Sequence, residues 1–250
     1  MSTNTEQHKP INKESYRFLW SHHSPVHRLA VKTFNKVMRY IPFSIKYGIG
    51  QSRRQNRFPY CLIDKGKTVV QVGAPMDTLR SGRSRALHFA LRTGEKGKTI
   101  IIEPDKDSEE WFGIFVSKHD LPQIKFVPYG AWNEKKTLSF YINPSHPATN
   151  FTEGTRRYSD KEMTAYKKID MPANTIDNIL EELKIKSPFL VSITTNGAES
   201  EILKGLEKSM LNGLPYISLA KTGEKYIELM NNYGYRLHAH DDRGYTFKRV

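Results

Sequence analysis

The feature that most constrains this chain is an alternation of short apolar strands with amphipathic helices from residue 68 onward. It begins with TVVQVG at 68–73, an apolar run that breaks into a glycine turn. The expected strands are 68–73, 98–104, 124–132, 189–194 and 215–220, and the expected helices are 82–93, 108–118, 177–183, 198–210 and 224–234. Such an alternation is typical of a mostly parallel sheet with helices on both faces, the doubly wound α/β class.

Two stretches depart from this alternation. The final segment, 235–250, has two strand-like runs around the turn DDRG, which predicts that the sheet ends in an antiparallel hairpin. TLSFYIN at 137–143 has the pattern of an edge strand. The polar stretch 143–172 shows no regular periodicity, and we expect it to be an irregular loop that faces the substrate.

A basic block occupies the N-terminal part of the chain. No acidic residue lies between Glu14 and Asp64, and this stretch holds nine lysines and arginines in a chain of formal charge +13. A block of this kind attracts phosphates, whether they belong to nucleic acid, an anionic membrane surface or an acidic glycan. The segment GQSRRQNR at 50–57 is expected to be an exposed basic loop.

A helix is predicted at 24–41 within this block. Ser24 is a suitable N-cap, Pro25 suits the first helical position, and Pro42 ends the helix. The apolar and basic residues of 24–41 fall on opposite sides of the helix. The apolar side can pack on the α/β domain, or the 24–57 region can contact a membrane surface. We expect a basic helical N-terminal extension at 1–60 and the α/β domain at 61–250.

Composition limits which cellular compartment and which chemistry we expect. No apolar run approaches the roughly eighteen residues of a membrane span, and the opening MSTNTEQHKPINKE lacks the apolar core of a signal peptide. We therefore expect a cytoplasmic protein, with peripheral membrane contact as a further option. The single cysteine, Cys61, excludes an internal disulfide, and the scattered histidines show no ligand spacing, so no metal is expected.

A cofactor site is predicted where the first two strands end. In a doubly wound sheet the ligand lies at the carboxyl ends of the central strands, and a glycine turn such as Gly73-Ala74 lets the backbone approach it. The next strand carries three consecutive isoleucines and ends at Glu103, whose carboxylate can accept hydrogen bonds from both hydroxyls of a ribose. This pair of features predicts a cofactor that contains adenosine.

Residues 60–250 resemble the FkbM-type S-adenosylmethionine-dependent methyltransferases in an ordered set of motifs. The motifs are VVQVGA, IIEPD, VPYGAW, NTIDNI, SITTNGAESEILKGL, PYISLA and NNYGYRL. The resemblance implies a class I methyltransferase fold, which is Rossmann-like. It also implies transfer of a methyl group to an oxygen, often a hydroxyl of a sugar, glycan or small metabolite.

The resemblance further implies which residues form the site. The implied cofactor-binding residues are Gln71, Gly73, Ala74, Glu103 and the turn Gly130, Ala131 and Trp132. The fourth major strand of the family usually continues as Lys-Ile-Asp-x-Glu-Gly-x-Glu, and here SITTNGAE stands at 192–199. The candidate catalytic residues are Thr194, Asn196 and Glu199. Glu199 can serve as a base, or it can be an acid favoured at the start of a helix.

Several family acids are replaced around this predicted pocket. Gln71 stands where an aspartate is usual, and Ala220 stands where a glutamate is usual. Alignment of the reactants can supply about 7 to 11 kcal/mol of the barrier to methyl transfer without an acid or base, so the neutral residues are compatible with activity. Asp177, in the segment TID, is expected to orient the chain instead of taking part in the chemistry.

Three functional hypotheses follow. The first is a methyltransferase that uses S-adenosylmethionine and acts on an anionic acceptor, because Arg80, Arg83 and Arg85 follow the glycine turn. The second is a catalytically inactive protein of the same fold that binds an anionic ligand. The third is an RNA methyltransferase, which the positive charge suggests, although the basic residues are not interleaved with a recognised RNA-binding motif.

Overall fold

The computed structural model describes residues 29, 33, 36–38, 40–144, 146–155, 158–213 and 216–250. The chain divides into two compact units, residues 1–42 and residues 43–250. In the first unit, residues 29, 33 and 36–38 are helical, as predicted for 24–41, and Leu29 and Val37 are exposed. The rest of the predicted helix lies outside the described residues.

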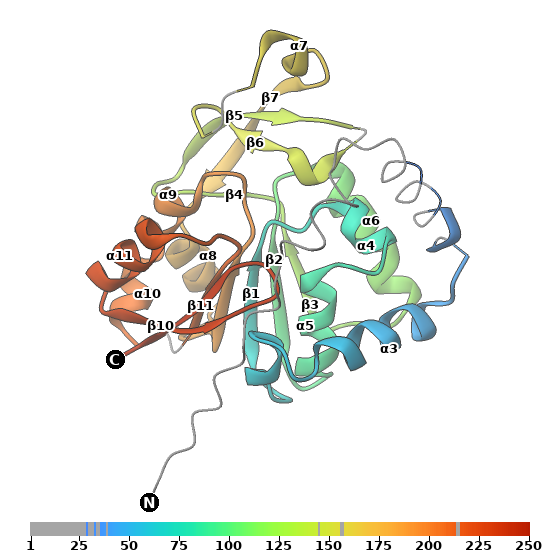
Figure 1. Cartoon of the computed structure of the whole chain (residues 1–250), viewed down its shortest axis with the longest axis horizontal. Helices are drawn as coiled ribbons and strands as arrows, with labels where there is room; N and C mark the ends of the chain where they lie inside the picture. Colours follow the sequence, from blue (N-terminus) through green and yellow to red (C-terminus); the bar gives the residue numbers. More distant parts are fainter. Residues whose placement is uncertain are drawn as a thin grey trace, which may run out of the picture. The chain divides into compact units, whose positions relative to one another are not determined.

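The second unit is built on a seven-stranded sheet in the order β10-β11-β9-β8-β1-β2-β3 (Figure 1). Its strands are β1 Thr68–Val72, β2 Lys98–Ile102, β3 Ile124–Val127, β8 Leu190–Ile193, β9 Tyr216–Leu219, β10 Tyr235–His240 and β11 Tyr245–Arg249. The first five are parallel, and β11 runs antiparallel between β9 and β10. The predicted doubly wound, mostly parallel sheet that ends in an antiparallel hairpin is confirmed.

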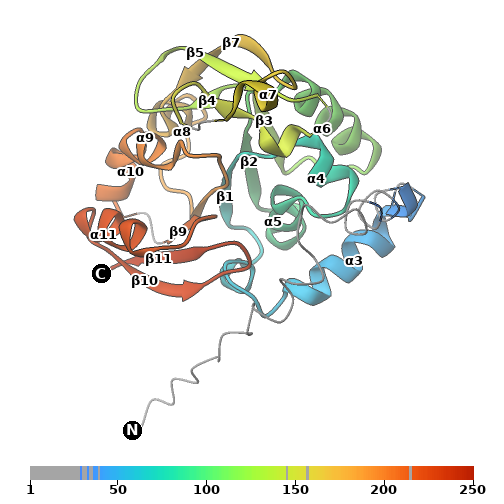
Figure 2. The same ribbon diagram turned by 45° about the horizontal axis from the view of Figure 1, so that its top comes forward.

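Helices cover both faces of this sheet (Figures 1 and 2). One face carries α3 Phe43–Arg54, α4 Met76–Arg80, α5 Arg85–Thr93 and α6 Lys106–Lys118. The other carries α8 Ile176–Glu182, α9 Glu199–Lys204, α10 Glu207–Leu211 and α11 Glu224–Asn232. The central strands are buried on both faces, which explains why β1 and β2 are continuous apolar runs.

The segment around residue 50 differs from the expected exposed loop. Helix α3 continues to Arg54 and packs on the domain with Tyr47, which is 1% exposed. A Cβ at Gly50 would lie 2.4 Å from the His88 ring, so glycine at this position lets α3 approach α5 closely. A short 3₁₀ helix, η1 Tyr60–Leu62, then leads into β1. Residues 43–60 thus belong to the second unit.

The expected strand 124–132 is two strands in two different sheets. The first, β3, ends at Val127, and β4 Gly130–Ala131 belongs to a second sheet. Pro128 lies between them, and proline cannot donate the N–H that a continued ladder requires. The break turns the chain out of the main sheet.

A small four-stranded sheet in the order β4-β7-β5-β6 lies over the carboxyl ends of the central strands (Figure 2). Its other strands are β5 Lys136–Ile142, β6 Phe151–Thr152 and β7 Lys167–Asn174. The expectation that 143–172 is irregular was wrong, because this stretch also contains η2 Pro147–Thr149, β6, α7 Asp160–Met163 and much of β7. The first half of β7 is largely exposed, and so it lacks the apolar alternation that marks a half-buried strand.

Within the described part of the chain, no helix has both the length and the apolar character needed to cross a membrane.

Candidate cofactor and acceptor site

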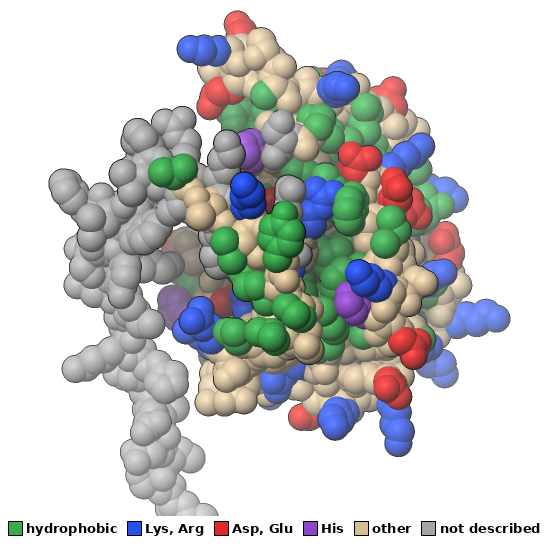
Figure 3. All heavy atoms as spheres, turned by 90° about the vertical axis from the view of Figure 1, so that its right-hand side faces the viewer, with side chains coloured by type: hydrophobic (Ala, Val, Ile, Leu, Met, Phe, Trp, Pro, Cys, Tyr) green, Lys and Arg blue, Asp and Glu red, His purple; other side chains and the backbone are tan. Residues whose placement is uncertain are grey.

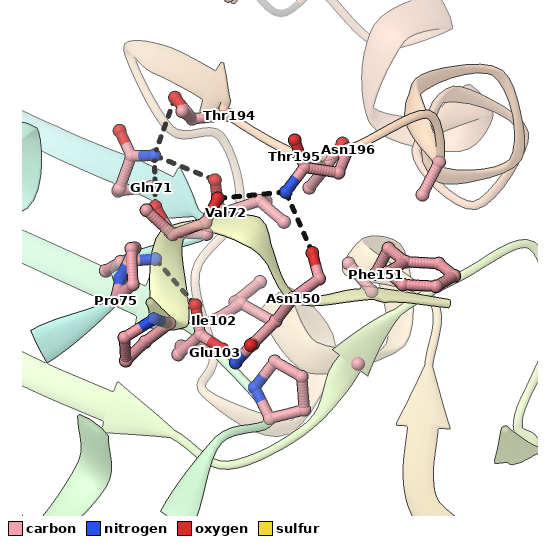
Figure 4. A pocket seen from close by; sticks show the side chains of 18 of the residues that line it. Gln71, Val72, Pro75, Ile102, Glu103, Asn150, Phe151, Thr194, Thr195 and Asn196 are labelled. Carbon is pink, nitrogen blue, oxygen red and sulfur yellow. Dashed lines mark hydrogen bonds between the residues drawn. The ribbon is translucent and has the colours of Figure 1, made fainter. Parts of the chain in front are cut away.

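A pocket opens at the carboxyl ends of β1, β2 and β8, beneath the small sheet (Figure 4). The structure brings most of the predicted site residues together in its wall: Gln71, Gly73, Ala74, Glu103, Gly130, Ala131, Thr194 and Asn196. These residues come from four segments that are far apart in the sequence. Two predicted residues, Trp132 and Glu199, do not line the pocket.

The glycine turn after β1 packs directly on the end of β8. Gly73 has φ +82°, and a Cβ at this position would lie only 2.1 Å from the carbonyl oxygen of Thr194. A side chain is therefore excluded both by the backbone conformation and by space. As a result, the pocket wall at this point is main chain, which a ligand can approach closely.

Glu103 fastens the same turn to the end of β2. Its Oε2 accepts a hydrogen bond from the Ala74 N–H at 2.8 Å, and its Oε1 accepts one from the Asp105 N–H at 3.2 Å. The side chain is also nearly inaccessible, because the residue is only 5% exposed. Each carboxylate oxygen has two lone pairs, so each can accept a further hydrogen bond from a ligand.

Burial raises the pKa of Glu103 to about 7. The N–H groups of Ala74 and Asp105 oppose this shift, since they stabilise the charged form, whereas the nearby acids Asp105 and Asp77 add to it. Burial also raises the pKa values of Asp77 and Asp105. The carboxyl group at the predicted ribose position therefore changes charge close to neutral pH.

Gln71 holds the ends of β1 and β8 together through its amide nitrogen (Figure 4). Nε2 donates to the carbonyl oxygens of Val72 at 2.7 Å and Gly73 at 2.9 Å, and lies 3.2 Å from Thr194 Oγ1. A carboxylate has no donor for these carbonyls. Gln71, where the resemblance implies an aspartate, thus makes hydrogen bonds that an ionised aspartate could not make. Its Oε1 is buried and has no hydrogen-bond partner among the described residues.

The segment that covers the pocket, which we call its roof, is hydrogen-bonded to Asn196 in the loop after β8. The Asn196 Nδ2 donates to the carbonyl oxygens of Ala148 at 3.0 Å and Asn150 at 2.8 Å. Asn150 is itself 9% exposed, and its Oδ1 accepts from the Asn143 N–H at 2.8 Å, which fixes the orientation of the amide. The Asn150 Nδ2 is buried without a partner in the described structure.

Sequence reasoning expected the stretch 143–172 to face the substrate, but it named none of the residues that form this roof. Its pocket-lining residues are Phe140, Pro147, Ala148, Asn150, Phe151 and Thr152. They lie in the small sheet and in η2, most of them within the stretch expected to be irregular. Phe151 and Pro147, two apolar residues within a polar segment, were the signal that this stretch covers something.

Glu199 lies behind the loop that carries Thr194 and Asn196. Its Oε1 accepts from Thr195 Oγ1 at 3.0 Å and from the Gly197 N–H at 3.4 Å, and it lies 3.6 Å from Lys221 Nζ. The residue is 2% exposed. These contacts fix the loop between β8 and α9.

Trp132 lies to the side of the pocket. Its backbone N–H donates to the Asn174 carbonyl oxygen at 3.0 Å, and Lys136 Nζ is 5.6 Å from the centre of its ring. The ring packs against the apolar cluster between the sheet and helices α8 to α11.

The three arginines that follow the glycine turn have different surroundings. Arg85 lines the pocket, but it is 4% exposed, and its Nη2 lies 3.4 Å from carboxylate oxygens of both Asp241 and Asp242. Arg80 and Arg83 do not line the pocket, and the Arg80 guanidinium lies 3.8 Å from the centre of the Trp111 ring.

A fourth arginine, which sequence reasoning missed, stands at the pocket. Arg243 comes from the turn between β10 and β11, which is distant in sequence from the glycine turn. Its side chain is exposed, and its Nη2 donates to the Arg83 carbonyl oxygen at 3.4 Å. The only signal in the sequence was the concentration of charge in DDRG.

Asp177 has the structural role that the sequence predicts. Its carboxylate accepts hydrogen bonds from the Lys208 N–H at 2.9 Å and the Ser209 N–H at 3.0 Å, and also contacts Ser209 Oγ. It therefore joins α8 to the start of α10. Among the residues that the structure describes, no group of histidine, cysteine and acidic side chains is arranged to hold a metal ion.

Comparison with known proteins gives one family match. The model of the methyltransferase FkbM domain matches residues 71–237. Among curated proteins, none matches the chain significantly in sequence.

Several solved structures have a similar arrangement, and three of them are compared with this chain. A methyltransferase FkbM from Methylobacillus flagellatus KT is 13% identical with a TM-score of 0.47, over 89% of this chain and 59% of that one. Fibrillarin from Aeropyrum pernix, with natively bound S-adenosyl-L-methionine, is 11% identical with a TM-score of 0.43, over 81% and 74%. A protein-L-isoaspartate O-methyltransferase is 23% identical with a TM-score of 0.23, over 26% and 19%. The chain thus spans less than two thirds of the length of the first and third of these proteins.

Proposed function

Because this chain belongs to the FkbM methyltransferase family, we propose that it transfers a methyl group from S-adenosylmethionine to a hydroxyl oxygen of a sugar, glycan or small metabolite. The observation that carries this proposal is the hydrogen bond between the Ala74 N–H, in the Gly73 turn, and the Glu103 carboxylate, at the carboxyl ends of neighbouring strands. A doubly wound sheet binds an adenosine-containing ligand at this place.

The residues of the pocket fit such a cofactor in three respects. The Gly73 turn offers main chain without a side chain in the way. Both Glu103 oxygens have lone pairs left to accept from the two ribose hydroxyls. The buried Nδ2 of Asn150, which has no partner among the described residues, is a donor for an acceptor atom of the ligand.

When bound, S-adenosylmethionine supplies an activated methyl group, so this chain has to provide alignment more than acid–base chemistry. We assign that task to Thr194 and Asn196, which line the pocket at the end of β8. The β8 loop is held from two sides, by Gln71 and by the carbonyl groups of the small sheet. Fixed side chains of this kind reduce the entropy lost in reaching a reactive alignment.

Glu199 acts in this proposal as a positioning residue. Its carboxylate contacts Thr195, Gly197 and Lys221 and does not line the pocket. Replacement by glutamine should lower kcat without changing the affinity for S-adenosylmethionine, and it should leave the pH profile of kcat unchanged. If a limb of that profile disappears in Glu199→Gln, the carboxylate is the general base instead.

The acceptor in this proposal carries negative charge. The charge of Arg85 is balanced by Asp241 and Asp242, but the exposed Arg243 stands at the pocket. Acceptors screened in pairs, with and without a phosphate or carboxylate, should favour the charged member. Arg243→Gln should raise KM for that member by about tenfold and leave the neutral member unaffected. Equal methylation of both members would disprove the anionic assignment.

Calorimetric titration with S-adenosylmethionine and with its demethylated product tests the cofactor assignment. We expect binding in the micromolar range, and Glu103→Ala should weaken it by at least about tenfold through loss of charge-assisted hydrogen bonds. Glu109→Ala, an exposed acid on α6, is the matched control and should bind as the native chain does. Binding without methyl transfer in an acceptor screen would favour the catalytically inactive alternative. No binding of either compound would refute the cofactor proposal.

A further inference from the structure

Helices α3 and α6 present apolar side chains to the solvent side by side. Ile45 and Ile49 of α3 are 53% and 54% exposed, and Trp111 and Ile114 of α6 are 40% and 52% exposed. We call these four residues the α3–α6 face. Figure 3 shows hydrophobic side chains gathered on this side of the molecule, with lysines, arginines and some acidic side chains around them.

The two helices are joined through a separate, inward set of aromatic side chains. The ring centres of Phe43 and Phe115 are 5.3 Å apart, and those of Phe43 and His119 are 4.3 Å apart. Tyr47 and Phe112 are buried beneath them. The contacts that join α3 to α6 therefore do not involve the α3–α6 face. Its two isoleucines lie four residues apart on a different side of α3.

The charge on α3 is of one sign. This helix carries Lys46, Arg53 and Arg54 and has no acidic residue. The acids of α6, Asp107, Glu109 and Glu110, all lie before Trp111, and Lys118 stands at its other end. Trp111 itself is covered on one side by the guanidinium of Arg80, 3.8 Å from the ring centre.

We propose that the α3–α6 face binds the surface of an anionic lipid bilayer. Apolar side chains and a tryptophan that enter the headgroup region, beside basic side chains that contact anionic lipids, are the features of an interfacial helix. A second copy of this chain is the competing occupant, and the oligomeric state distinguishes it from a membrane surface. A membrane surface supplies both the apolar depth and the opposite charge.

Sedimentation of the full chain with extruded vesicles tests this proposal. The chain should bind vesicles of phosphatidylcholine containing about one third phosphatidylserine and should not bind vesicles of phosphatidylcholine alone. Binding should weaken as salt is raised, because the surface charges are screened. Absence of binding to the anionic vesicles would overturn the proposal.

A double variant locates the binding face. Ile45→Gln with Ile49→Gln removes two apolar side chains and keeps helix-forming residues and charge, and it should weaken vesicle binding by roughly 100-fold. Leu211→Gln is the control, because Leu211 is 57% exposed on α10, on the opposite face of the sheet. If the double variant binds as well as the native chain, another segment makes the contact and the proposal is wrong.

Trp111 gives a second readout. Brominated acyl chains should quench its fluorescence in the anionic vesicles, and the quenching should be largely lost in Trp111→Phe, which keeps Trp20 and Trp132. Light scattering after size exclusion tests the competing occupant. A dimer that the Ile45/Ile49 double variant dissociates would assign the face to a second copy and overturn the proposal. Titration should give the same affinity for S-adenosylmethionine in the double variant as in the native chain. The membrane proposal and the proposed function can therefore be refuted separately.

Discussion

Glu103 shows how the surroundings of a single residue decide its chemistry in this pocket. In sequence it is an acid at the end of an apolar run, and the fold places it in a buried position that raises its pKa to about 7. Gln71 is the converse case, since a neutral amide occupies a position where the family usually has an acid. Its two bonds to carbonyl oxygens are ones that a carboxylate cannot make.

The raised pKa of Glu103 predicts a pH dependence of stability. The pKa rises from 4.5 to about 7 on folding, so the folded state holds a proton that the unfolded state has lost between these values. The free energy of unfolding should therefore fall as pH rises through this window, by on the order of 1 kcal/mol per pH unit from this group. Urea unfolding of the native chain and of Glu103→Gln measures the effect, and the two slopes should differ by this amount. Parallel slopes would show that Glu103 titrates normally.

Cofactor binding should change with pH in the opposite direction. Ribose hydroxyls donate most strongly to the ionised carboxylate, so affinity for S-adenosylmethionine should increase by about tenfold between pH 6 and pH 8. Calorimetry across this range measures the change. In Glu103→Gln the affinity should be weaker and nearly independent of pH. A native affinity that stays flat over the same range would contradict the ribose assignment.

Restoring a carboxylate at Gln71 should not restore a better site. Gln71→Glu keeps the size of the side chain but removes the donor to the Val72 and Gly73 carbonyls and sets a buried negative charge beside them. The variant should lose about 2 kcal/mol or more in the free energy of unfolding. Thermal unfolding with and without S-adenosylmethionine is the measurement. Equal or greater stability would mean that the amide network has little value.

At the scale of elements, the small sheet completes the pocket. The main sheet supplies the floor of the pocket, and η2 with β6 supplies the roof over it. Two hydrogen bonds from Asn196 join the roof to the β8 loop. The roof, which we propose faces the acceptor, is therefore built from the segment whose sequence is least regular.

Removal of the Asn196 side chain should loosen this roof. Asn196→Ala leaves the Ala148 and Asn150 carbonyl groups without their donor, and backbone amides at 148–152 should exchange hydrogen about tenfold faster or more. Amides of β1 and β2 should be unaffected and serve as the internal control. Hydrogen exchange followed by mass spectrometry resolves the two regions. An unchanged rate at 148–152 would show that other contacts hold the roof.

At the scale of the whole molecule, Arg85 joins two ends of the domain. It is the first residue of α5, and its partners Asp241 and Asp242 lie in the final hairpin. Tyr60, ahead of β1, donates to Asp242 at 3.0 Å, and Ser218 of β9 donates to Asp241 at 2.6 Å. Through this network the turn that carries Arg243 is set beside the pocket.

Loss of Arg85 should destabilise the domain strongly. Arg85→Met keeps much of the apolar contact but leaves two acids without their cation, at a cost of about 3 to 5 kcal/mol in the free energy of unfolding. Arg92→Met, at the half-buried end of the same helix and without an acidic partner among the described residues, should cost much less. Urea unfolding compares them. Similar losses in both variants would assign the effect to packing instead of charge.

The sequence by itself determined the central architecture. Apolar runs of β1, β2, β8 and β9 and the turn DDRG predicted the parallel sheet and its final hairpin, because strands buried on both faces and tight turns leave local patterns. The position of Gly73 and Glu103 at the ends of adjacent strands follows from the same patterns. That is why most of the predicted cofactor residues meet in one pocket.

Tertiary structure alone decided the rest. The small sheet is held by pairing between distant strands, such as β5 with β7, and its exposed residues carry no periodic signal. Whether an arginine is neutralised, as Arg85 is, or stands at the pocket, as Arg243 does, depends on residues more than 150 positions away. Local sequence records burial and turns, whereas long-range pairing and the balance of charge exist only after the chain has folded.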